Sequence, residues 1–261
     1  MSDVFCTMQS FWKNTLILYT RFLLRYHRFS VTGLDHVLDD GAKLIAGYHG
    51  RGLPMDLAMV GYEIYRRKGY FPHAVMHRRL WQIPVVRDVV DGWGAVPSEV
   101  PKLAEAIARG ESFLVAPGGT REAFRRFDVR YQVNFGRRRG YLRMALQHGL
   151  PIVPVASWGV DDRYLGLVDG HALADRLGMP SDSLIWLGIG LGGVFPLALP
   201  FPVRIHTVIG APIDVHSASN KTPGSPEHLD ELNDLVTGRI QDLLEEARVG
   251  HKNRSHRGVL S

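Results

Sequence analysis

Residues 44–56 read Leu-Ile-Ala-Gly-Tyr-His-Gly-Arg-Gly-Leu-Pro-Met-Asp, an apolar run followed at once by a glycine-rich polar turn. The run is typical of a buried β-strand, so the turn places His49 and Asp56 where that strand ends. Catalytic groups often occupy such a position. The pair alone is weak evidence, because a chain with 12 histidines contains a His and an Asp at any chosen offset about once by chance.

A second stretch repeats this design. Residues 113–122 read Phe-Leu-Val-Ala-Pro-Gly-Gly-Thr-Arg-Glu, again an apolar run before a turn. The Pro-Gly-Gly break frees backbone N–H groups for an oxyanion or a phosphate, and a guanidinium suits phosphate. The alternative is an ordinary surface turn with an ion pair. We predict a substrate-binding turn formed by Gly118, Gly119, Thr120, Arg121 and Glu122.

Strand signals alternate with helical patterns along the chain. The predicted strands are Ala42–Tyr48, His73–Met76, Gly94–Val96, Ser112–Ala116, Ile152–Ala156 and Arg204–Ile209. The predicted helices are Asp56–Arg67, Pro84–Asp91, Val100–Arg109, Arg139–His148 and Pro226–Val249. This alternation predicts an α/β fold with a mixed, mostly parallel sheet covered by helices on both faces. Ligands of such sheets bind beyond the carboxyl ends of the strands, where both polar turns are expected.

Length and composition predict one packed domain. The 261 residues carry no Pro/Ser/Gly-rich linker, and the lone Cys6 excludes an internal disulfide or a cysteine-based zinc site. We expect a membrane-interface helix over residues 1–30, a main domain over 31–249 and a flexible basic tail over 250–261. No metal site or cofactor is predicted.

The N-terminal segment Val4–Phe29 has an amphipathic pattern. Its predicted apolar side carries Phe5, Met8, Trp12, Tyr19, Leu23 and Tyr26. Its predicted basic side carries Lys13, Arg21, Arg25 and Arg28. Such a helix lies in a membrane interface. The alternative is a helix packed on the domain's own core.

Residues 183–203 form a second apolar stretch, which contains no charged residue. Its length is near the ~20 residues that cross a bilayer, but its glycines and prolines would leave backbone groups unpaired in lipid. Three interpretations remain: a membrane-dipping hairpin, the wall of an acyl-chain pocket, and a core segment.

Basic residues are concentrated in one stretch of a chain with a net charge of +5. Its members are Arg125, Arg126, Arg130, Arg137, Arg138, Arg139 and Arg143. They predict either contact with an anionic partner or a solvated basic face.

Together these blocks resemble the glycerolipid acyltransferase superfamily, which includes lysophospholipid and lysophosphatidic acid acyltransferases, and especially its diacylglycerol acyltransferase-like branch. The resemblance rests on His49 with Asp56, on the Pro117–Arg121 turn, and on the apolar Pro151–Pro154 strand, and it covers residues 49–212. It implies acyl transfer from acyl-CoA or acyl carrier protein to a glycerolipid hydroxyl, at the cytoplasmic face of a membrane. It also implies that His49 and Asp56 are catalytic.

Two departures bear on these assignments. The superfamily's common form has four residues between His and Asp, a spacing at which this chain has Pro54, and Asp56 comes two residues later. We expect the loop to bulge at Gly50 and Gly52, which tolerate positive φ. Gly118 stands where phosphate-acceptor enzymes usually carry Glu, as in the branch that acylates neutral diacylglycerol.

The chemistry of these residues fits acyl transfer. An imidazole with a pKa of about 6.5 can take the proton of an attacking alcohol, and a carboxylate can orient it and stabilise the imidazolium. Absence of a Gly-x-Ser-x-Gly elbow agrees with a mechanism in which the substrate hydroxyl is the nucleophile. Two other functions remain open: a lipid esterase or thioesterase, and a non-catalytic module that binds anionic lipid or, given interleaved aromatics, nucleic acid.

Overall fold

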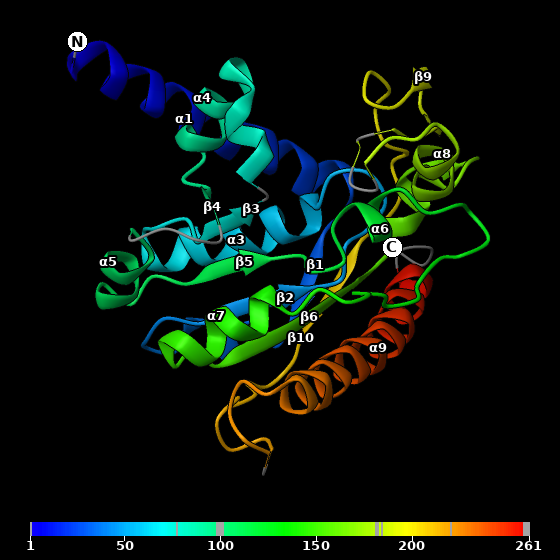
Figure 1. The fold of residues 1–261 in the computed structure, drawn as a ribbon. Coiled ribbons are helices and arrows are strands. Elements are labelled where there is room, and N and C mark those ends of the chain that lie inside the picture. Colours follow the sequence, from blue (N-terminus) through cyan, green and yellow to red (C-terminus); the bar gives the residue numbers. More distant parts are fainter. Residues whose placement is uncertain are drawn as a thin grey trace.

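The computed structural model describes residues 2–76, 78–97, 102–180, 183, 185–219 and 221–257. Over these ranges the chain forms a seven-stranded sheet of order β1-β10-β6-β2-β5-β3-β4 (Figure 1). The strands are β1 Ser30–Thr32, β2 Leu44–Gly47, β3 His73–Met76, β4 Val96–Pro97, β5 Phe113–Val115, β6 Ile152–Trp158 and β10 His206–Ile209. Among the described strand pairs of this sheet, only β10–β6 is antiparallel. The prediction of a mixed, mostly parallel α/β sheet is confirmed.

Helices cover both faces of the sheet (Figure 1). Their bounds are α1 Ser2–Tyr26, α2 Asp35–Leu38, α3 Met55–Lys68, α4 Pro84–Gly92, α5 Lys102–Ala108, α6 Thr120–Ala123, α7 Gly140–His148, α8 Gly170–Arg176 and α9 Pro226–Arg257. α9 lies against β6 and β10 on one face, and α3 lies on the other with α1 outside it.

Successive residues of β2 pack into two different hydrophobic clusters, one on each face of the sheet. Leu44 and Ala46 belong to the cluster that contains the apolar residues of α9, whereas Ile45 belongs to the cluster around Leu57 and Val60 of α3. All five are almost fully buried. Burying each large aliphatic side chain stabilises the fold by about 1.5–3 kcal/mol, so β2, with both faces covered, is firmly held.

Helix α3 is well delimited. Glu63 pairs with Arg67 on the next turn at 2.6 Å, and Gly69 ends the helix with φ of 78° and an N–H that donates to the Tyr65 carbonyl. Asp56 lies in the first turn, where a negative charge is favoured by the helix dipole. The helix thereby fixes one end of the turn that follows β2.

The N-terminal helix differs from its predicted orientation. Leu16, Thr20 and Leu23 are buried against the domain, and Trp12 packs on Gly92 of α4. Trp12 and Leu23 therefore face the domain and not a membrane interface, because the domain packs against that side of the helix. The side chains of Phe5 and Met8 lie outside the described residues. The four predicted basic side chains are exposed as expected.

Residues 183–203 supply β8 Gly188–Gly190 and β9 Gly193–Val194, which form a small antiparallel sheet with β7 Leu165–Gly166. In the described part of the chain, no helix is long and apolar enough to cross a bilayer. At the other end, α9 continues to Arg257, well beyond the expected end at Val249.

Candidate active site

Three loops meet at the carboxyl edge of the central strands. β2 lies between β5 and β6 and runs parallel to both. The turn 48–56 follows β2, the turn 116–122 follows β5, and the loop 159–163 follows β6. Parallel strands end at one edge, so these loops are neighbours, as the first two were predicted to be. The third loop was missed, although Gly159-Val-Asp-Asp-Arg163 directly follows a predicted strand.

His49 is buried, with only 8 % of its surface exposed. Its Nδ1 lies 2.8 Å from the carbonyl oxygen of Gly50. A carbonyl can only accept a hydrogen bond, so Nδ1 carries the proton and Nε2 keeps its lone pair. Burial, assisted by the charges of Arg125 and Arg163, lowers the pKa of His49 to about 4. The imidazole is therefore neutral at physiological pH and its Nε2 is a proton acceptor.

Two side chains hold the backbone of His49. Glu122 accepts the His49 N–H at 2.9 Å with one oxygen and the Asn134 N–H at 2.7 Å with the other. Arg125 donates to the His49 carbonyl oxygen at 2.6 Å. Glu122 is fully buried, and this burial raises its pKa to about 7. Its carboxylate therefore joins the β2 turn to the loop after α6.

The charge of Arg125 is balanced inside the protein. It pairs with Asp161 at 3.0 Å, and both side chains are almost completely buried. The second oxygen of Asp161 accepts the Tyr48 hydroxyl at 2.6 Å and the Tyr131 N–H at 2.7 Å. The Arg125 guanidinium also lies over the Tyr48 ring, 4.4 Å from its centroid. A buried ion pair with these additional partners fixes geometry, and removing either member would leave a buried charge uncompensated.

Two further arginines tie the β2 turn to the β6 loop. Arg51 donates to the carbonyl oxygen of Asp161 at 2.7 Å, and Arg163 donates to the carbonyls of Arg51 at 2.8 Å and Leu53 at 2.7 Å. Both arginines are among the largest fully buried side chains. Sequence reasoning missed Arg51, Asp161 and Arg163, because a charged residue in a turn is usually solvent-exposed.

Asp56 is also buried, and among the described residues no hydrogen bond or ion pair joins it to His49. Its Oδ1 is buried without a hydrogen-bond partner, and a hydrogen bond from the Ser157 hydroxyl stabilises its charged form. Burial raises its pKa, and the Arg163 charge opposes this. Arg163 influences the pKa of both His49 and Asp56, so both lie near this guanidinium.

The bulge expected at the two glycines occurs at one of them. Gly52 has φ of 77°. Gly50 is required for a different reason: a Cβ atom there would lie 2.5 Å from the Cβ of Val160. The longer loop is thus held against the β6 loop.

The five residues of the turn after β5 point in different directions. Glu122 folds under Gly118, where a Cβ atom would lie 2.2 Å from the carboxylate. The Gly119 N–H donates to the Ala116 carbonyl at 3.0 Å, so it is already used within the turn. Thr120 Oγ1 is buried without a partner. The Arg121 side chain is exposed and makes no ion pair with the described residues.

The arginine-rich stretch is not one continuous basic face. Arg125 is internal, Arg126 pairs with Asp128, Arg130 pairs with Asp162 at 2.9 Å, and Arg139 pairs with Asp230 at 2.9 Å. Four of the seven arginines are thus paired with acidic residues of the protein itself.

Comparison with known proteins agrees with this architecture. A family model described as diacylglycerol acyltransferase matches residues 45–257. A human protein named DGAT1/2-independent enzyme synthesizing storage lipids is 26 % identical over 226 residues, covering 84 % of this chain and 66 % of that protein. The uncharacterized protein Rv0502 of Mycobacterium tuberculosis is 27 % identical over 245 residues, covering 89 % of this chain and 65 % of that protein. The chain thus spans slightly less than two thirds of the length of these relatives.

A solved structure has the same fold. The crystal structure of the 1-acyl-sn-glycerophosphate acyltransferase PlsC from Thermotoga maritima superimposes with a TM-score of 0.52 at 17 % identity, covering 88 % of this chain and 79 % of that one. This similarity shows a shared fold, whereas the match of the family model shows which family the chain belongs to. By that match, which extends over most of its length, the chain belongs to the diacylglycerol acyltransferase family.

Proposed function

We propose that this protein transfers a fatty acyl group from a thioester donor, acyl-CoA or acyl carrier protein, to a hydroxyl of a glycerolipid, with His49 as general base. The observation that carries this proposal is the buried, neutral imidazole with Nδ1 bonded to the Gly50 carbonyl. No hydrogen bond to Nε2 is found among the described residues, so this nitrogen can receive a proton.

The proton path is short. As the acceptor hydroxyl attacks the thioester carbonyl, its proton passes to His49 Nε2, and the carbonyl becomes a tetrahedral oxyanion. Collapse of the oxyanion breaks the C–S bond, and the imidazolium returns the proton to the leaving thiolate. The oxygen ester and the free thiol are the products, and no covalent enzyme intermediate forms.

Asp56 is proposed to stabilise the imidazolium during this step. Its Oδ1 is buried without a partner, and a hydrogen bond from the Ser157 hydroxyl favours the charged carboxylate. A buried oxygen without a partner is rare in folded proteins and calls for a role. Pairing with the ring after proton transfer would provide that partner.

The turn after β5 is proposed to bind the substrate. The Thr120 hydroxyl can donate to the oxyanion, because it has no partner within the protein. The exposed Arg121 can bind a phosphate of the donor. Gly118 shapes the turn by making room for Glu122.

The acceptor is proposed to be a diacylglycerol or a lysophospholipid rather than glycerol 3-phosphate. Gly118 replaces the Glu typical of phosphate-acceptor enzymes, and Glu122 is turned inward. A relative whose name refers to storage-lipid synthesis supports a neutral product. We also propose that the protein works at the cytoplasmic face of a membrane, held there by α1.

The proposal is tested by thiol release from palmitoyl-CoA with the full chain in mixed micelles. The arms contain diacylglycerol, lysophosphatidic acid, lysophosphatidylcholine, glycerol 3-phosphate or no acceptor. Release that depends on one of the first three, with the matching product in lipid mass spectrometry, supports the proposal. A clear preference for glycerol 3-phosphate contradicts the assigned acceptor class.

A thioesterase is the second candidate, because the same neutral Nε2 would activate water equally well. In the same assay it would release thiol at one rate in every arm and form free palmitate. The arm without acceptor therefore separates the two functions.

A further inference from the structure

The β8–β9 hairpin and its continuation expose apolar side chains to an unusual extent. The exposed fractions are 51 % at Leu191, 48 % at Val194, 92 % at Leu197 and 51 % at Leu199. These four residues lie within a nine-residue segment, and a β-bridge pairs Leu191 with Leu199, so the exposed apolar side chains are concentrated in one part of the surface. Exposed apolar surface concentrated in this way marks an interaction site.

The opposite side of the segment packs on the candidate site. Phe195 contacts a cluster of Phe124, Tyr164 and Trp186 through ring contacts at 5.6–6.0 Å. The Tyr164 hydroxyl donates to the Ala198 carbonyl at 3.1 Å, and the Phe195 ring lies close to Gly52 in the loop between His49 and Asp56. The hairpin therefore has a rigid base, so its apolar outer side is not a loose end that could fold inward.

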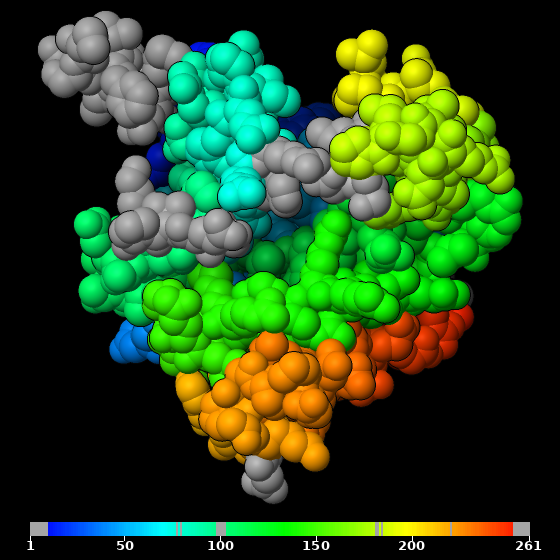
Figure 2. All heavy atoms as spheres, viewed as in Figure 1, coloured from blue at the N-terminus to red at the C-terminus, as the bar shows by residue number. Residues whose placement is uncertain are grey.

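Helix α1 has a matching outward stripe. Phe11 is 60 % exposed, Leu18 is 62 % exposed and Phe22 is 49 % exposed, and their spacing of seven and four residues places them on one side of the helix. The Tyr26 hydroxyl, at the end of α1, donates to the Pro200 carbonyl at 2.7 Å, directly after the hairpin. α1 and β9 lie on the same side of the sheet in Figure 1, and Figure 2 shows the surface notched between α4 and this hairpin with α1 behind the notch.

The charge around these two elements has one sign. Residues 4–34 and 183–213 contain no Asp or Glu. Lys13, Arg21 and Arg25 are exposed along α1. An apolar surface on two segments whose only charged residues are cations is complementary to a bilayer leaflet that contains anionic lipid.

We propose that the hairpin 188–199 is a second membrane-inserting element, which docks the protein on an anionic leaflet together with the outward stripe of α1. Leu197 and its neighbours enter the acyl-chain region, and the basic residues of α1 contact the headgroups. Phe195 joins the inserted hairpin to the His49 loop, so a lipid acceptor reaches the site without leaving the leaflet. This inference rests on the proposed attachment through α1 but not on the reaction.

The test places a fluorophore at one position at a time. In a Cys6→Ser background, Leu197→Cys, Leu18→Cys and Leu235→Cys are labelled with an environment-sensitive dye and mixed with phosphatidylcholine vesicles containing 30 % phosphatidylglycerol and doxyl-labelled lipid. Leu235 is the matched control, because it is an exposed leucine on α9, which covers the other face of the sheet. We expect quenching at positions 197 and 18 and none at 235.

A binding measurement accompanies the labelling. Leu197→Asp should weaken vesicle binding about ten- to hundredfold, the loss expected for removing one buried leucine, and Leu235→Asp should not. Quenching at 18 without quenching at 197, or unchanged binding of Leu197→Asp, overturns the proposal while leaving α1 and the acyltransferase activity intact. If Leu197→Asp instead converts a dimer to a monomer, the surface belongs to a second copy of the chain and the proposal also fails.

Discussion

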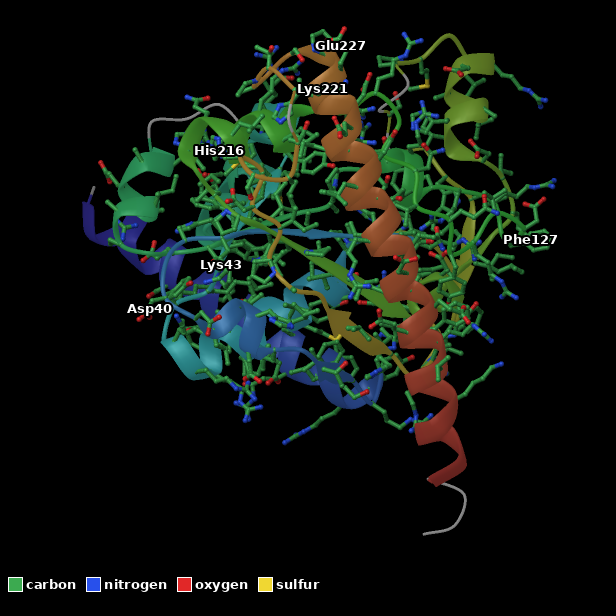
Figure 3. The ribbon with its side chains drawn as sticks, turned by 90° about the horizontal axis from the view of Figure 1, so that it is seen from below. Asp40, Lys43, Phe127, His216, Lys221 and Glu227 are labelled. Atoms are coloured by element: carbon green, nitrogen blue, oxygen red, sulfur yellow. The ribbon has the colours of Figure 1, made fainter. Side chains whose placement is uncertain are left out.

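The two edges of the sheet carry similar residue types, but these residues have different environments at each edge. At the amino edge, Lys43 donates to the carbonyls of Asp39 at 2.8 Å and Asp40 at 3.1 Å, and a hollow surrounds them that is lined by residues 39–43, 148–151 and Pro212. At the carboxyl edge, His49 and Asp56 are buried with shifted pKa values and an unpartnered oxygen. Figure 3 shows Asp40 and Lys43 far across the molecule from Phe127, which follows α6.

This difference shows that a surface hollow and the groups with shifted pKa values need not lie at the same place. The amino edge offers a hollow, but its one buried cation is already satisfied by loop carbonyls. The carboxyl edge holds groups with shifted pKa values. Side chains from three loops form hydrogen bonds with the backbone of the turn after β2. Perturbed groups with available atoms, rather than concavity, indicate where a reaction is carried out.

The largest expected effect is the loss of the base. His49→Ala should lower acceptor-dependent thiol release by about 10²–10⁴-fold, the range for a positioned general base. Initial rates at fixed lipid concentration measure it. The control is His216→Ala, an exposed histidine labelled in Figure 3 away from Phe127, which should keep full activity. More than a tenth of the wild-type rate in His49→Ala would remove His49 from the mechanism.

Asp56→Asn should be almost as damaging. The amide carries no negative charge, so it cannot stabilise the imidazolium as the Asp56 carboxylate is proposed to do. The reduction should appear in kcat, with a normal far-ultraviolet spectrum. Full activity would mean that the Gly50 carbonyl alone orients the ring.

Asp161→Asn tests the buried ion pair that supports the candidate site. Loss of its charge leaves Arg125 buried without a counter-ion, which should lower the free energy of unfolding by about 3–5 kcal/mol. Urea denaturation at pH 7.5 measures this. A change below 1 kcal/mol would show that the buried pair does not hold the carboxyl edge together.

The smallest effect is expected at the amino edge. Asp40 is exposed and lies 3.6 Å from Lys68, so Asp40→Asn should change stability by about 0.5 kcal/mol or less and leave thiol release unchanged. The same urea and rate measurements apply. A tenfold loss of activity in this variant would mean that the hollow at this edge binds a substrate.

Much of the fold was predictable from local patterns. The alternation of Leu44, Ile45 and Ala46 between two covered faces makes a continuous apolar run, which identifies a central strand. β1 was missed because Ser30-Val-Thr32 has a single apolar residue, whereas the equally short β5 reads Phe113-Leu-Val115. The orientation of α1 was wrong in part, because both its inner and its outer sides are apolar, and periodicity cannot tell which side faces the domain.

The meeting of the two polar turns at one sheet edge was predictable, but the internal connections of the candidate site were not. A strand followed by a polar turn indicated His49, Asp56 and residues 118–122. The inward direction of Glu122 and its bonds to two backbone amides depend on loops that meet only after folding. Arg125 belongs to a basic stretch in the sequence, and only the packing of β6 beside β2 gives it Asp161 as a partner.

His49 is proposed to be a neutral base before substrate binds, and the pH dependence of kcat/KM reports its protonation state. Glu122 has a pKa raised to about 7 by burial, so its titration is removed by using Glu122→Gln. The charges of Arg125, Arg163 and Asp161, which shift the His49 pKa, remain in this variant. With that pKa lowered to about 4, only about 3 % of the imidazole is protonated at pH 5.5, and the fraction falls further as pH rises. In Glu122→Gln, kcat/KM should therefore stay constant within about twofold from pH 5.5 to 8.5. An acid limb near pH 6.5 in that variant would mean that His49 titrates as an exposed histidine does, and would contradict the claim.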